Sequence, residues 1–154
     1  MPVETVLQLE RESLLIYTGG AHVSGSIHDD IRTAYRLPQS TTLRAMFDLR
    51  TQAELMTECL EAGDLAGYAG AMQKCRFAHY ALHESCDSPR LREFFEILDP
   101  LILGGKTCGA GGGGFILVCA KPDCYRDCVE AVERHALQIW PVAVGWKGVE
   151  SWSE

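Results

Sequence analysis

The sequence lacks three features that would assign it to a class of protein directly: a long apolar run, an excess of basic residues and an N-terminal signal. No apolar run approaches the roughly 18 residues that a membrane span needs. Lys and Arg number 14 against 21 Asp and Glu, which gives a formal net charge of −7, whereas proteins that bind nucleic acid or anionic membranes usually carry a basic surface. The first twelve residues alternate apolar and charged side chains and contain no basic or apolar signal region. We therefore expect no nucleic-acid partner, no membrane partner and a cytoplasmic location.

The sequence also lacks the cysteine pattern of a disulfide-stabilised secreted protein. Its seven cysteines are an odd number without regular spacing, whereas small secreted scaffolds normally pair an even number. Free thiols in a reducing cytoplasm explain this set most simply. The 154 residues are 47% hydrophobic and 23% charged, which is ordinary for a globular domain with one core. Composition therefore predicts a single domain over residues 1–154.

Apolar patterns in the first half of the chain predict one strand followed by helices. Residues 13–18 form a short apolar run that ends at two glycines, which is typical of a buried strand. A helix is expected to start near Ser24 or Ser26, because serine is a favoured N-cap. Apolar residues then recur at spacings of three and four over 46–60 and again over 65–82. These two amphipathic helices are expected to form an antiparallel hairpin.

The second half predicts a short helix and then a glycine-rich loop with strands around it. Ser88-Pro89 is a typical helix start, and residues 104–114 hold seven of the 15 glycines in the chain. Residues 115–120 are expected to form a strand, 121–135 a helix and 142–146 a final strand. This order predicts an α+β sandwich, in which a small antiparallel sheet has helices on one face.

The glycine-rich segment resembles two nucleotide-binding patterns by its letters alone. Residues 109–114 match G-x-G-x-x-G, but that fingerprint needs a strand before it and a helix after it, whereas the sequence predicts a helix before it and a strand after it. Gly105-Lys106-Thr107 matches the end of a Walker A loop, but Pro100 stands where that pattern requires glycine. Both interpretations are therefore rejected.

The physical properties of the segment leave two interpretations open. Glycine adopts positive φ without steric cost, and consecutive backbone N–H groups can form an anion-binding concavity. Ordering so flexible a segment costs about 1–2 kcal/mol per residue, which favours a function over a plain connection. The alternative is a tight turn packed against a neighbouring helix. Similarly, Lys106 either stabilises the charge of a bound phosphate or is a solvated lysine at the loop entrance.

Residues Gly104 to Phe115 resemble the third conserved motif of the GHMP kinases, the fold family of galactokinase, homoserine kinase and mevalonate kinase. The sequence is most similar to the branch that includes heptose 7-phosphate kinase and the fucokinases. Leu15 to Gly19 resembles the strand that opens the C-terminal domain in that branch. The helical hairpin, the Ser88-Pro89 helix and the glycine loop follow in the family's order. The resemblance implies a ferredoxin-like α+β domain like the C-terminal domain of these kinases.

The resemblance implies part of an ATP-dependent kinase that acts on a sugar or a sugar phosphate. In the family, the ATP phosphate loop, the catalytic Asp and the magnesium carboxylate come from the N-terminal half, which is expected to be absent from residues 1–154. No catalytic residue is therefore expected in this chain, and little or no turnover by it alone, because phosphoryl transfer depends on positioning and charge stabilisation. ATP and Mg²⁺ are implied for the complete enzyme, and neither is expected to bind tightly to this chain alone.

The resemblance also assigns site residues. Support of the ATP phosphates is implied for the residues of the glycine loop, namely Lys106, Thr107, Gly109, Ala110, Gly111, Gly112, Gly113 and Gly114. His22, where relatives often carry a basic residue, and Ser24 are the candidates for substrate contact. Two alternatives remain: a stand-alone, non-catalytic binding or regulatory module, and a subunit that acts in trans with the missing half or as a homo-oligomer. The subunit alternative predicts an exposed apolar face.

Two pairs of residues have the spacing of metal ligands on a helix. His79 and His83 lie one turn apart, with Cys86 beyond them, but His79 falls on the apolar face of its helix. A packed and hydrogen-bonded core histidine is therefore favoured. Cys124 and Cys128 also lie one turn apart, and core packing is favoured for both because they lack zinc or redox spacing. No metal site is predicted.

Overall fold

The computed structural model describes residues 1–19, 24–37, 41–145, 147 and 151–152. Within this part of the chain the secondary-structure elements are α1 (Val3–Glu12), β1 (Ser13–Tyr17), α2 (Ser24–Tyr35), α3 (Thr41–Ala62), α4 (Leu65–Tyr80), the 3-10 helix η1 (Glu84–Cys86), α5 (Pro89–Leu98), β2 (Ile102–Thr107), β3 (Phe115–Ala120), α6 (Tyr125–Arg134) and β4 (Gln138–Trp140). None of the described helices is both long and apolar enough to cross a membrane.

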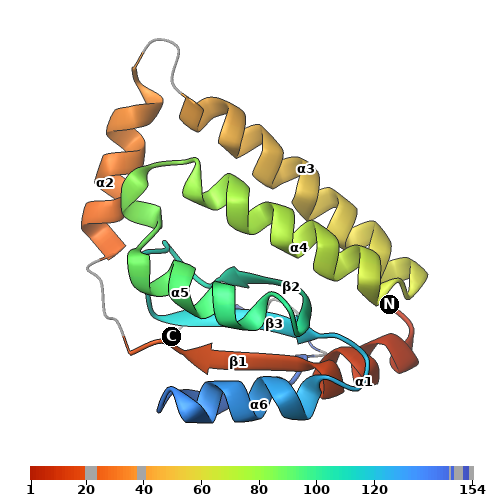
Figure 1. The fold of residues 1–154 in the computed structure, drawn as a ribbon. Coiled ribbons are helices and arrows are strands. Elements are labelled where there is room, and N and C mark those ends of the chain that lie inside the picture. Colours follow the sequence, from red (N-terminus) through yellow and green to blue (C-terminus); the bar gives the residue numbers. More distant parts are fainter. Residues whose placement is uncertain (20–23, 38–40, 146, 148–150, 153–154) are drawn as a thin grey trace.

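The strands form one antiparallel sheet in the order β2-β3-β1-β4 (Figure 1). β1 lies inside the sheet, since Leu15 pairs with Leu117 of β3 on one side and with Trp140 of β4 on the other. With α5 before β2 and α6 between β3 and β4, the chain follows the β-α-β-β-α-β order of the ferredoxin-like fold. The expected α+β class and antiparallel sheet are confirmed.

Helices cover both faces of this sheet, rather than one face as expected. α5 and α6 share one face, where Leu91 and Val132 pack with Ile16 of β1 in the main core. α1 and α4 cover the opposite face, where Leu9 and Met72 pack with Cys119 of β3. Successive side chains of a strand point to opposite faces, and the central strands carry apolar residues on both. The sheet therefore needs two helical layers.

The predicted helical hairpin is formed by α3 and α4, with α3 packed outside α4 (Figure 1). The Oδ1 atom of Asp64 accepts a hydrogen bond from Gly67 N at 2.8 Å and caps α4. The apolar face of α3 is less buried than the periodicity indicated, since Met46 and Ala53 are exposed. The buried residues of α3 are Thr42, Ala45 and Cys59. Apolar residues of α3 therefore remain on the outer surface.

Three elements differ from the sequence prediction. α1 was not predicted, although Val6 and Leu9 are spaced for one helical face and both are buried. β2 includes Gly104 to Thr107, which the prediction placed in the loop. β4 ends at Trp140, so the strand expected over 142–146 is absent from residues 142–145, and Trp146 lies outside the described residues.

Candidate functional site

The loop between β2 and β3 is a tightly folded turn, and we call residues 108–114 the glycine turn. Gly109, Gly111, Gly112 and Gly114 all have positive φ, between +72° and +97°. Cys108 N donates to Phe115 O at 2.8 Å and closes the turn at its base. The turn follows a strand and not a helix, which corrects the sequence prediction. A strand also follows it, so the helix that a dinucleotide fingerprint needs is still missing.

Two other segments hold the glycine turn by hydrogen bonds to its backbone. Both the backbone N and the Oγ1 atom of Thr18, at the end of β1, donate to Gly114 O at 2.8 Å. On the other side, Gly112 N donates to Cys86 O at 2.9 Å. A Cβ atom on Gly111 would lie 2.5 Å from Cys86 O, so only glycine fits there. The turn therefore has one shape, fixed by residues distant in sequence.

His79 of α4 provides the third support. Its Nε2 atom lies 3.0 Å from Ala110 O, and a carbonyl oxygen only accepts, so Nε2 carries the proton. The Nδ1 atom then accepts from the Thr107 hydroxyl at 3.0 Å. Burial, and then the positive charge of Lys106, lower the pKa of His79, which favours this neutral form. The prediction of a packed, hydrogen-bonded core histidine is confirmed.

A cavity of about 260 Å³ lies beside the glycine turn. Its lining consists of Thr18, Ser88, Pro89, Arg90, Leu91, Gly112 and Gly113. Ser88 Oγ caps α5 by accepting from Leu91 N at 3.2 Å, and the partial positive charge of this helix end faces the same region. Arg90 adds a full positive charge. The cavity therefore suits an anionic group such as a phosphate.

The structure separates the residues that the sequence assigned to this site. Gly112 and Gly113 line the cavity, and Thr107 and Ala110 are held by His79. The ammonium group of Lys106 donates to Thr107 O at 2.8 Å, and Lys106 is not among the lining residues. Of the substrate candidates, His22 lies outside the described residues and Ser24 is the first residue of α2.

Sequence reasoning missed Thr18, Ser88 and Arg90 as lining residues. One signal was available for Arg90: it stands in the first turn of α5, which contains no acidic residue. A basic side chain at that end of a helix is electrostatically unfavourable, unless it faces an anion. Thr18 and Ser88 carried no such signal, because the cavity exists only after distant segments have come together.

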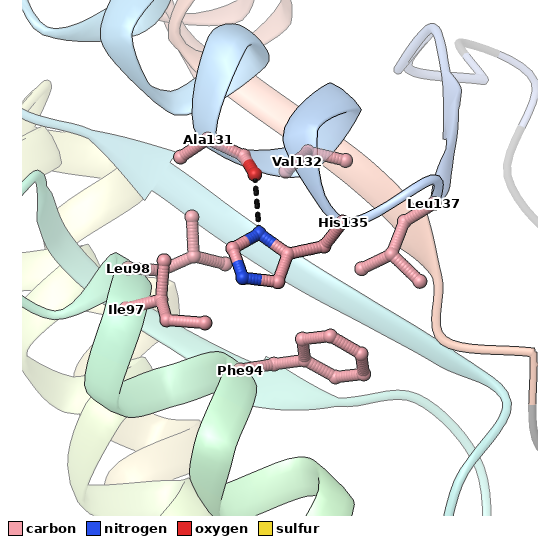
Figure 2. A pocket seen from close by; sticks show the side chains of 7 residues that line it. All are labelled: Phe94, Ile97, Leu98, Ala131, Val132, His135 and Leu137. Atoms are coloured by element: carbon pink, nitrogen blue, oxygen red, sulfur yellow. Dashed lines mark hydrogen bonds between the residues drawn. The ribbon is translucent and has the colours of Figure 1, made fainter.

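Two further regions lack the groups of a functional site. A narrow pocket between α5 and α6 is lined by apolar side chains and His135 (Figure 2). The Nδ1 atom of His135 donates to Ala131 O at 2.8 Å, and the ring lies edge-on to Phe94 at 6.5 Å. Few polar groups therefore converge on this pocket. No group of three or more His, Cys, Asp or Glu that could hold a metal occurs in the described part of the chain.

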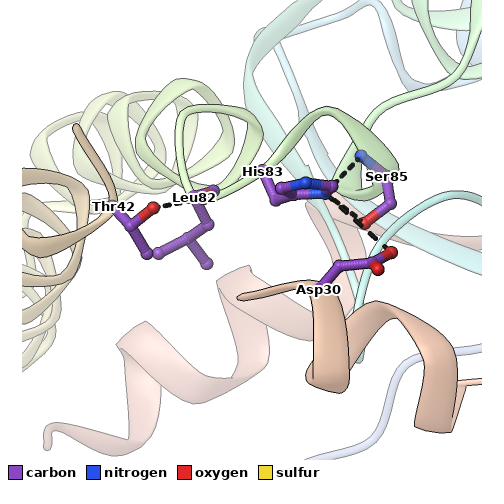
Figure 3. A network of polar contacts seen from close by, with 5 residues as sticks. All are labelled: Asp30, Thr42, Leu82, His83 and Ser85. Atoms are coloured by element: carbon purple, nitrogen blue, oxygen red, sulfur yellow. Dashed lines mark hydrogen bonds and ion pairs between the residues drawn. The ribbon is translucent and has the colours of Figure 1, made fainter. Parts of the chain in front are cut away.

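A cluster near the end of α4 combines the three residue types of a hydrolytic triad, Asp30, His83 and Ser85 (Figure 3). Ser85 Oγ lies 2.8 Å and Asp30 Oδ2 4.0 Å from the same nitrogen, Nδ1 of His83. A triad needs the nucleophile on one ring nitrogen and the acid on the other. The backbone N of Ser85 also donates to Nδ1 at 3.2 Å. The cluster therefore caps a short helix and is not a nucleophilic site.

Comparison with known proteins relates the chain to sugar kinases. It is 25% identical over 134 residues to the bifunctional fucokinase/GDP-fucose pyrophosphorylase of Arabidopsis thaliana, a match that covers 86% of this chain and 13% of the relative. It is 23% identical over 146 residues to the D-glycero-alpha-D-manno-heptose 7-phosphate kinase of Campylobacter jejuni, covering 94% and 42%. The chain thus spans less than half the length of these relatives. No protein-family model matches it.

Solved structures share the fold. The mevalonate kinase of L. major in complex with R-mevalonate superposes with a TM-score of 0.73 at 19% identity, covering 86% of this chain and 43% of that one. The phosphomevalonate kinase of Streptococcus pneumoniae gives 0.69 at 17% identity, covering 84% and 39%. The fold is that of GHMP kinases, and the relatives in sequence are sugar and sugar-phosphate kinases of that type. The resemblance stated from the sequence is confirmed.

Proposed function

We propose that this chain is the C-terminal part of an ATP-dependent kinase that phosphorylates a sugar or a sugar phosphate. The observation that carries the proposal is the glycine turn, which is held in one shape beside a cavity that contains Arg90. Phosphoryl transfer requires positioned phosphates and stabilised charge more than covalent chemistry by the protein. A rigid turn and a cationic cavity supply both kinds of support.

In this proposal each residue of the site has its own role. The glycine turn packs beneath the phosphates of ATP and preserves their position, while His79 and Thr107 keep the turn in shape. Lys106 contributes positive charge from the α4 side of the sheet, since its charge acts on His79. The magnesium ligands and the catalytic carboxylate come from an N-terminal half, as the resemblance to the GHMP kinases implies.

Arg90 favours a phosphorylated substrate over a neutral sugar. Arg90 lines the cavity together with the first turn of α5, and planar arginine binds phosphate oxygens in pairs. Among the relatives, one is named a heptose 7-phosphate kinase and another a fucokinase. A sugar phosphate therefore suits this cavity better than fucose.

The test measures transfer of the γ-phosphoryl group of ATP to fucose and to D-glycero-D-manno-heptose 7-phosphate in the presence of Mg²⁺. One sample is the chain alone, and the other is the chain extended by the coding region that precedes it in its genome. We expect transfer only by the extended protein, and to the heptose phosphate in preference. Ordinary turnover by the chain alone would contradict the proposal, as would an extended protein that phosphorylates no sugar.

A second candidate function is a binding module without catalysis, because the cavity and all three supports of the turn lie within this one chain. Calorimetry that measures the affinity of wild type and of Gly111→Ala for heptose 7-phosphate tests this function. The substitution forces a Cβ against Cys86 O at a φ of +97°. We expect affinity to fall by about tenfold, which corresponds to about 1.4 kcal/mol. The matched control is Gly109→Ala, where φ is also positive but the Cβ meets open space. Equal affinities of wild type and Gly111→Ala would exclude binding at the turn.

A further inference from the structure

α3 carries an apolar ridge on its outer surface. Leu43, Phe47, Thr51 and Leu55 recur at every fourth residue and are all exposed, and the three apolar side chains retain 46%, 60% and 37% of their accessible surface. The ridge lies opposite the buried face of α3, and α3 is the outermost helix of its hairpin (Figure 1). Exposed apolar groups of this kind mark interaction surfaces.

The charges around this ridge are arranged with opposite signs at its two ends. Arg44 lies near the start of α3, where its side chain is 88% exposed and makes only a long ion pair, 4.0 Å, with Asp48. Glu58 and Glu61 lie near the end of the helix and are exposed. An antiparallel copy of α3 would therefore place the basic end of each helix on the acidic end of the other.

The apolar and charged positions are also symmetric about Thr51. Phe47 and Leu55 stand four residues before and after it, and Arg44 and Glu58 stand seven residues before and after it. A two-fold interface requires such self-complementarity. If residue i of one copy contacts residue j of the other copy, then residue j of the first copy also contacts residue i of the second. Ridges of residues spaced by four interdigitate in the commonest class of helix packing.

We propose that the outer face of α3 binds a second copy of this chain, in an antiparallel arrangement with a two-fold axis near Thr51. Phe47 then packs against Leu55 of the second copy, and Arg44 approaches its Glu58. α3 has 22 residues, and a single pair of such helices makes a small interface, so the dimer is weak. This inference does not depend on the kinase proposal.

Sedimentation velocity of the full chain over a series of concentrations tests the dimer. We expect a reversible shift from monomer to dimer as the concentration rises. Phe47→Ser should move the shift to concentrations at least about tenfold higher, a loss of about 1.4 kcal/mol. Leu7→Ser is the matched control, because Leu7 of α1 is also exposed, at 52%, but lies outside the ridge. Circular dichroism checks that both variants are folded.

A charge exchange tests the antiparallel orientation. Arg44→Glu and Glu58→Arg should each weaken the dimer, and the double variant should restore it, because the two charges still face each other with their signs exchanged. Arg126→Glu on α6 is the control, since it breaks a similar exposed pair with Glu130, at 3.2 Å, on another face. A chain that stays monomeric, which would leave the face for another occupant, overturns the proposal. The proposal is also overturned if Phe47→Ser dimerises at the same concentrations as wild type, or if the double charge variant does not regain the dimerisation of wild type.

Discussion

His79 shows how one buried side chain on a helix controls the shape of a turn on the sheet. Its two ring nitrogens bridge Thr107 at the end of β2 and Ala110 within the glycine turn. The apolar periodicity of α4 was enough to predict that this histidine is buried and hydrogen-bonded. The partners themselves could not be predicted, because they lie about 30 residues further along the chain. The cavity beside Arg90 could not be predicted either, because Thr18 and Gly112, which also line it, are distant in sequence.

The neutral state of His79 makes stability depend on pH. Burial lowers the pKa of His79 below its ordinary value of 6.5, so just below that pH the unfolded chain binds a proton that the folded chain does not. The contribution of His79 is therefore present at neutral pH and is lost as the pH falls below about 6.5. His79→Gln keeps a donor and an acceptor but does not titrate.

Denaturant unfolding from pH 7.5 to pH 5 measures this contribution. The free energy of unfolding should fall more steeply with decreasing pH in wild type than in His79→Gln. Parallel curves for wild type and His79→Gln would contradict the role assigned to this side chain.

The sequence predicted the helices and strands whose signals are local. α5 begins at the predicted Ser88-Pro89 start, and β3 spans the predicted residues 115–120. β2 was missed because Gly104 and Gly105 have little preference for strands. It forms because β3, the next strand along the chain, pairs with it across the glycine turn, and because α4, which is distant in sequence, packs closely against it.

Gly104 is required by the close approach of α4 to β2. A Cβ atom at this position would overlap the backbone carbonyl of Ala69, so Gly104→Ala forces the helix away from the sheet. We expect a loss of about 1–3 kcal/mol in the free energy of unfolding, the usual cost of overpacking. Gly70→Ala is the matched control, since its Cβ meets open space on α4 and alanine favours a helix by about 0.5–1 kcal/mol. Urea denaturation of both variants measures the two effects, and a Gly104→Ala protein as stable as wild type would contradict the packing argument.

The two helical layers keep most thiols away from solvent. All seven cysteines are free, and five of them are buried, while Cys108 and Cys124 are half-buried. Burial raises the pKa of the Cys128 thiol to about 11 and also raises those of Cys75, Cys86 and Cys119. Since the thiolate is the reactive form, these thiols are inert in the folded protein.

Titration with a chromogenic disulfide reagent tests this distribution. At pH 8 the native protein should react at two thiols at most, Cys108 and Cys124, and all seven should react after guanidinium denaturation. Of the two, Cys124 should react first, because burial raises the pKa of Cys108. Replacing Cys124 with Ser should remove the fastest phase. Rapid modification of more than two thiols in the native state would show that the helical layers open readily.

The position of β1 has a consequence for how the protein folds. β1 lies early in the sequence, but its partners β3 and β4 follow about a hundred residues later. Ser13, for example, pairs with Cys119. Loops of that length are closed slowly, because the entropy is lost before the contacts form. During synthesis on the ribosome, the α3–α4 hairpin can assemble from local contacts before β3 and β4 are available to pair with β1. The glycine turn, which needs Thr18 after β1, is then completed only after Phe115 has emerged.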